Sequence, residues 1–118
     1  MTFLTKIYQQ LEENSIVDTT EDFSRRFLKR SPSYYRSIKA QKRDGSDEVL
    51  GNLITTLNAH NNLTRGHTGE HQVMRDWLAR CEDIERQVAD EIASRAVDNG
   101  MLKGNALGAV IRALQGKL

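Results

Sequence analysis

Apolar residues recur three or four positions apart through most of the chain, and this is the spacing of amphipathic helices. Strand-like alternation is rare, and the chain has a single proline. The segments with helical spacing, in chain order, are 3–14, about 19–28, 32–41, 47–60, 70–98 and 105–116. The predicted fold class is therefore all-α, with four helices followed by a long amphipathic helix and a short C-terminal one.

Side chains that cap helices mark three of the predicted helix starts. Thr19, with Asp22 three positions later, fits a capping box. Ser31 before Pro32 predicts a start because serine accepts a backbone N–H and proline at the first helical position has none to lose. Ser46 is a suitable N-cap for the fourth helix. The chain should therefore break into separate helices at these points.

The stretch NAHNNLTRGHTG is polar, turn-rich and nearly free of apolar groups, which is typical of a linker. We therefore expect an N-terminal four-helix unit over 1–60, a linker over 61–69 and a helical region over 70–118. The long helix can fold back on the N-terminal unit or pair with its copy in a second chain. Because so short an N-terminal unit has little core, pairing is preferred. The predicted dimer interface is Trp77, Cys81, Ile84, Val88, Leu107, Ile111 and Leu114.

The net charge is +1, which by itself implies no partner, but the charge is unevenly distributed. Between Ser24 and Arg43 there are eight basic residues and no acidic one, whereas the rest of the chain has 9 basic and 16 acidic residues. Such a polarity orients a protein toward a polyanion. The eight cations are Arg25, Arg26, Lys29, Arg30, Arg36, Lys39, Lys42 and Arg43.

Several classes of protein are not expected from this sequence. No apolar run is long enough for a membrane span, and the N-terminus lacks the pattern of a signal peptide. The one cysteine, Cys81, cannot form an internal disulfide, which fits a reducing, cytoplasmic location. Cys81 lies on an apolar stripe and is expected to be a buried, inert thiol.

No catalytic signature is present, so we expect neither an enzyme nor a cofactor or small-molecule substrate. His67 and His71 are four apart, the spacing at which two imidazoles can share a metal on a helix. Gly66 and Gly69 argue against a helical His67, and no zinc-finger spacing exists. Loop histidines facing solvent are the expected interpretation, and no metal site is predicted.

Two short helices joined by a basic connection suit the major groove of DNA, which is about as wide as one helix. Ser24 supplies the small residue where the helices cross, and the inner face consists of Phe23, Phe27, Tyr35 and Ile38. Ser33, Arg36 and Ser37 are then free to reach base edges, and Arg36 can take two acceptors on a guanine. The expected phosphate contacts, which provide most of the affinity, are Arg25, Arg26, Lys29, Arg30, Tyr34, Lys39, Lys42 and Arg43.

The pieces TTEDFSRRFL, SPSYYRSIKA and SDEVLGNLITTL together resemble the helix-turn-helix domain of the phage repressor and Cro type. The resemblance covers the first 57 residues. It implies operator binding as a homodimer and transcriptional repression, as in a small bacterial or phage regulator, with Ser33, Arg36 and Ser37 at base-contacting positions. Two departures exist. The turn Leu28–Ser31 is one residue longer and lacks the usual glycine, and Thr20-Glu21 stands where the family often has glutamine.

A second interpretation of the basic stretch is a non-enzymatic adaptor or anti-regulator that binds an acidic protein. Lysine and arginine also cover many helices merely for solubility, and charge alone does not separate these roles. A mobility-shift assay against random duplex at low salt would distinguish them, because an adaptor should give no shift.

Overall fold

The computed structural model describes residues 1–67 and 71–98. Its elements are α1 (Phe3–Glu13), α2 (Thr20–Asp22), a π-helical turn η1 (Phe23–Phe27), α3 (Tyr34–Ala40), α4 (Asp47–Arg65) and α5 (Gln72–Asp98). These residues contain no strand, so the all-α prediction is confirmed. The helix predicted at 105–116, with Leu107, Ile111 and Leu114, lies outside the described residues.

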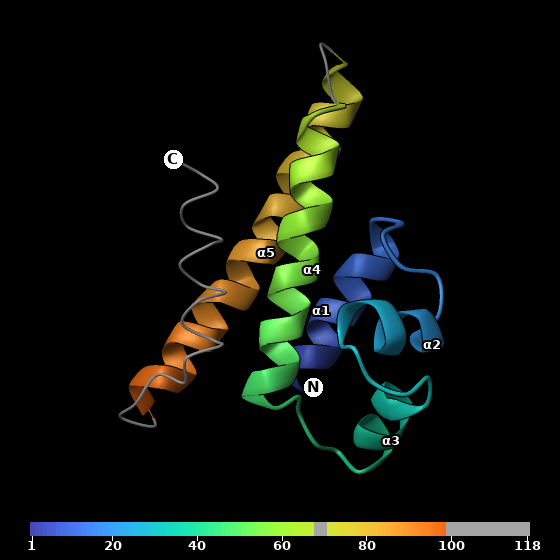
Figure 1. Cartoon of the computed structure of the whole chain (residues 1–118), viewed down its shortest axis with the longest axis vertical. Coiled ribbons are helices and arrows are strands. Elements are labelled where there is room, and N and C mark those ends of the chain that lie inside the picture. The colour runs from blue at the N-terminus through green and yellow to red at the C-terminus, as the bar shows by residue number, and fades with distance from the viewer. Residues whose placement is uncertain (68–70, 99–118) are drawn as a thin grey trace.

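The two longest helices, α4 and α5, pack side by side and form the long axis of the molecule (Figure 1). In this view α2 and α3 lie on the opposite side of α4 from α5, and α1 packs against α5. The basic stretch is therefore carried by the short elements at one side. The helix α5, with seven acidic residues and four arginines, lies at the other.

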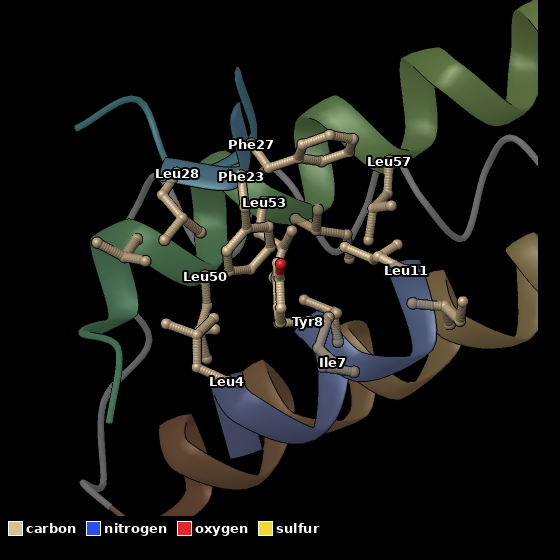
Figure 2. Close-up of a cluster of buried hydrophobic side chains, with 14 of the residues drawn as sticks. Leu4, Ile7, Tyr8, Leu11, Phe23, Phe27, Leu28, Leu50, Leu53 and Leu57 are labelled. Carbon is tan, nitrogen blue, oxygen red and sulfur yellow. The ribbon is translucent and has the colours of Figure 1, made fainter. Parts of the chain in front are cut away.

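One hydrophobic core joins α1, η1, α3, α4 and α5. Leu4, Ile7 and Leu11 of α1 meet Phe23 and Phe27 of η1 and the leucines of α4, as Figure 2 shows. The ring of Tyr8 lies 5.2 Å from that of Phe23 and 5.0 Å from that of Tyr35, measured between centroids. Burial and the neighbouring Glu12 carboxylate raise the pKa of Tyr8 to about 12. The predicted inner face of the two short helices is confirmed, since Phe23, Phe27, Tyr35 and Ile38 are all buried.

Two of the predicted caps are present. The Thr19 hydroxyl accepts the N–H of Asp22 and the Ser46 hydroxyl accepts that of Val49. The π-helical turn that follows Asp22 inserts an extra residue, because the N–H of Leu28 bonds to the carbonyl of Phe23 instead of that of Ser24.

The predicted linker is wrong over 61–65, which continue α4 up to Arg65. The polar stretch looked like a linker because its inward face is itself polar. The amides of Asn58 and Asn61 donate to the carboxylate of Glu85 on α5 at 3.2 and 2.7 Å, and Asn61 and Glu85 are fully buried. Polar residues that pack against each other between two helices produce no apolar periodicity, so hydrophobic patterning cannot detect them.

The predicted dimer interface is wrong for Cys81, Ile84 and Val88 of α5. Cys81, Ile84 and Val88 are no more than 1% exposed and belong to the chain's own core, so α5 folds back on the N-terminal helices. Trp77 is half-buried, and its indole N–H donates to the carbonyl of Asn14 at 2.7 Å. Burial also raises the pKa of the Cys81 thiol to about 11, which agrees with an inert side chain.

The C-terminus of α1 is closed by a Schellman motif in which Ser15 takes the left-handed conformation, with φ of 60°. The N–H of Ile16 bonds to the carbonyl of Leu11 at 2.9 Å, and that of Ser15 to the carbonyl of Glu12 at 3.1 Å. Glycine is the usual residue here because a Cβ raises the energy of the left-handed region.

We therefore expect Ser15→Gly to stabilise the protein by about 0.5–1 kcal/mol, since it removes the strain of a side chain at positive φ. In thermal unfolding followed by circular dichroism, the midpoint should rise by roughly 3–6 °C. Ser15→Ala is the control, because alanine retains the Cβ and should bring no gain. An equal rise for both variants would mean that the Ser15 side chain, and not the backbone, is unfavourable.

Candidate nucleic-acid interface

The eight cations of the basic stretch remain at the surface. Arg30 is half-buried, and the exposed ones are Arg25, Arg26, Lys29, Arg36, Lys39, Lys42 and Arg43. They come from η1, the connection to α3, α3 itself and the turn after it. We call this set of eight residues the basic surface. Because its elements are short and adjacent, positive charge that is continuous in sequence stays together in the fold.

Ser24 fixes the start of α3 against the preceding helix. Its side chain is fully buried, and its Oγ accepts the backbone N–H of Tyr35 at 3.0 Å while donating to the carbonyl of Thr20 at 3.0 Å. The hydroxyl of Tyr35 in turn donates to Thr5 of α1 at 3.2 Å. A small residue was expected at this crossing. In the structure Ser24 also caps the next helix through its hydroxyl.

The predicted start of α3 at Ser31-Pro32 is wrong by two residues. The N–H of Tyr34 bonds to the carbonyl of Ser31 at 3.0 Å, which makes a turn, and α3 begins at Tyr34 after Ser33. Because Ser24 already accepts the N–H of Tyr35, no serine side chain of the connection is needed as a cap. The connection between η1 and α3 is therefore longer than predicted and covers 28–33.

A left-handed residue follows both η1 and α3. Lys29 has φ of 56° and precedes Arg30, whose N–H bonds to the carbonyl of Ser24 at 2.9 Å. Lys42 also has φ of 56°, and the N–H of Arg43 bonds to the carbonyl of Ile38 at 2.8 Å. Lys29 thus adopts the backbone conformation for which glycine was expected in the turn, and it adds a cation there.

The three residues predicted to contact bases, Ser33, Arg36 and Ser37, are all exposed at the beginning and on the outer face of α3. Arg36 Nη2 lies 3.3 Å from Oε1 of Glu21 in α2. The pKa of the Glu21 carboxyl is lowered, mainly by a hydrogen bond from its own backbone N–H and further by the charge of Arg36. From the sequence, Glu21 was expected only to favour the helix N-terminus and to replace the usual glutamine.

Ion pairs divide the cations of the basic surface into two groups. In the first group, Arg36 pairs with Glu21, Arg26 pairs with Asp22 at 2.9 Å, and Arg30 lies 3.5 Å from Glu48 and stacks over the ring of Tyr34. The other five cations of the basic surface have no carboxylate partner among the described residues, and these are Arg25, Lys29, Lys39, Lys42 and Arg43. The second group needs no internal ion pair to be broken before it binds an anion.

Two residues that sequence reasoning missed hold the loop after α3 in place. The carboxylate of Asp44 accepts the N–H groups of Phe3 and Leu4 at 3.3 and 3.0 Å and so caps α1. Arg95 of α5 reaches Asp44 at 3.0 Å and Asp47 at 3.6 Å. These contacts join three elements that are distant in sequence, so no local signal could have predicted them.

Within residues 1–67 and 71–98, no three histidine, cysteine or acidic side chains lie close enough to hold a metal ion. His67 and His71 are both exposed. In the same part of the chain, none of the helices combines the length and the apolar character needed to cross a membrane.

Fold and surface together define a class, namely an all-α protein with a cationic face built from short helices. Residues 4–101 match the sequence profile of a family of unknown function (DUF6626), and the chain belongs to this family. No curated protein and no solved structure matches the chain significantly. The family carries no assigned activity, so the function has to be argued from the surface itself.

Proposed function

We propose that the protein is a sequence-specific DNA-binding transcriptional regulator whose basic surface docks on double-stranded DNA. The observation that carries this proposal is that eight cations, continuous in sequence, all remain accessible around α3. Five of them have no ion-pair partner among the described residues, so phosphates can bind them directly. The outer face of α3, with Ser33, Arg36 and Ser37, supplies the base contacts.

The aromatic residues favour duplex over single-stranded nucleic acid. Proteins that bind single strands present exposed rings on which bases stack. Here Tyr35 is 1% exposed, and Phe23 and Phe27 are fully buried. Tyr34 is half-buried, with the guanidinium of Arg30 5.9 Å from its ring centroid. A surface with many cations and no fully exposed ring suits a phosphate backbone that is already ordered in a double helix.

We further propose that two copies act together on DNA, in the manner that the resemblance to phage repressors implies. Two-fold symmetric operators require two recognition helices about one DNA turn apart. The buried residues of α5 pack in the core of their own chain, so the contact between the two copies has to use another surface. Sedimentation velocity with and without duplex distinguishes a stable dimer from pairing on DNA alone.

The direct test is a mobility-shift titration of the full chain against random duplex at low salt. The proposal requires a shift whose binding constant falls steeply as salt increases, because phosphate contacts release counterions. Selection from a random duplex pool would then give the preferred sequence. A protein that leaves every duplex unshifted at low salt would instead support the adaptor function, with an acidic protein as the partner.

Arg36 and Lys39 lie on the same helix and should behave differently. Arg36→Ala should lose about 1–3 kcal/mol of discrimination for the selected sequence while keeping weak general binding. Lys39→Ala should weaken binding to all sequences alike and lower the salt slope by about one unit. Equal losses for both variants on every sequence would contradict this assignment of base and phosphate contacts.

A further inference from the structure

Arg36 does not face solvent alone, because a carboxylate from another helix stands beside it. Glu21 Oε1 lies 3.3 Å from Arg36 Nη2, and the two side chains are 45% and 61% exposed. Glu21 belongs to α2 and Arg36 to α3, so the pair bridges the two short helices at the outer surface. A hydrogen-bond acceptor and a fork of donors are thus placed next to each other on the face that would meet DNA.

The carboxylate of Glu21 is held in position by its surroundings. The hydroxyl of Thr20 donates to Oε2 of Glu21 at 3.3 Å, and the backbone N–H of Glu21 bonds to its own side chain. These contacts and Arg36 lower the pKa of Glu21, so the group is ionised at neutral pH. An exposed ion pair of this kind contributes little to folding stability. The pair of Glu21 and Arg36 therefore matters more for what the surface can bind than for folding stability.

The edge of a C·G base pair in the major groove has the complementary arrangement. Guanine offers two acceptors, O6 and N7, and the cytosine amino group is a donor beside O6. The guanidinium of Arg36 can bind both guanine acceptors, while the carboxylate of Glu21 accepts from the cytosine. An A·T pair has an amino group next to N7, so it cannot offer arginine two adjacent acceptors on one base.

We propose that Glu21 is a specificity-determining residue that reads a C·G pair of duplex DNA together with Arg36. The inference rests on the proposed function, and it names a residue of α2 as part of the base-reading surface. The same carboxylate weakens binding wherever it meets a phosphate or a base edge without an amino group. Glu21 therefore lowers general affinity and increases the preference for one base pair.

The test compares Glu21→Gln with Glu48→Gln in the full-length protein. Both changes remove one negative charge beside a cation of the basic surface, but Glu48 pairs with Arg30, which lies outside α3. Sequences are selected from a random duplex pool with each protein, and dissociation constants are measured for the selected duplex and for single C·G to A·T replacements. Thermal unfolding of the two variants should match that of the unmodified chain.

Glu21→Gln should bind random duplex more tightly and lose about tenfold of the preference for C·G at one position. Glu48→Gln should also bind more tightly but keep the preference. If Glu21→Gln strengthens binding to all sequences equally and the selected sequence is unchanged, Glu21 acts only through its charge and the inference is overturned. If the unmodified protein shifts no duplex at all, the proposed function itself fails. This result differs from a protein that binds duplex but whose Glu21→Gln variant keeps the same selected sequence.

Discussion

Replacing Arg25, Lys39, Lys42 and Arg43 together by glutamine should weaken binding to random duplex at least about a hundredfold at low salt. Each of these cations is exposed and has no carboxylate partner among the described residues. Each should therefore replace one condensed counterion on DNA. The slope of log K against log salt should accordingly decrease by about 3 to 4 units. Fluorescence anisotropy titrations at several salt concentrations measure both quantities.

The matched control removes four cations from other surfaces of the chain. Lys6, Arg75, Arg80 and Arg86 are exposed and lie on α1 and α5. Their joint replacement by glutamine changes the net charge by the same amount but should leave the salt slope nearly unchanged. Similar losses in both quadruple variants would show that binding follows net charge alone, and the basic surface would not be a docking site.

Ile84→Ala should destabilise the protein by about 2–5 kcal/mol, because it opens a cavity between α5 and the rest of the core. Ile84 is 1% exposed and belongs to the same hydrophobic cluster as Leu4 and Leu57. The loss is a large fraction of the stability of a small domain. Urea denaturation followed by circular dichroism measures it, and Ile84→Val should lose only about 0.5–1.5 kcal/mol.

The same experiment distinguishes a core helix from a dimer interface. When Ile84 packs within its own chain, the urea midpoint does not depend on protein concentration. For an interface between two chains, the midpoint rises with protein concentration in the unmodified protein, and the effect of Ile84→Ala depends on concentration too. A midpoint that changes over about a hundredfold range of protein concentration, together with an effect of Ile84→Ala that changes with it, would restore the dimer interface predicted from the sequence.

The sequence by itself determined the fold class, most helix positions and the charge distribution. The stripes of α1 and α4, and the caps Thr19 and Ser46, are local features that require only neighbours along the chain. Helix periodicity and capping act over three or four residues, and for this reason they can be read before any tertiary contact is known. The basic surface was predictable for the same reason, because its cations are close together in the sequence and lie on short elements and the connections next to them.

Tertiary structure alone decided what each buried face packs against. The stripe of α5 shows that Cys81, Ile84 and Val88 are inward-facing, but periodicity does not say whether the covering surface belongs to the same chain. The continuation of α4 through Asn61 depended on Glu85, a residue of another helix. Contacts between distant residues also set the start of α3, through the hydroxyl of Ser24, and placed Glu21 beside Arg36. A hydrogen bond between residues far apart in sequence has no spacing that the sequence can reveal.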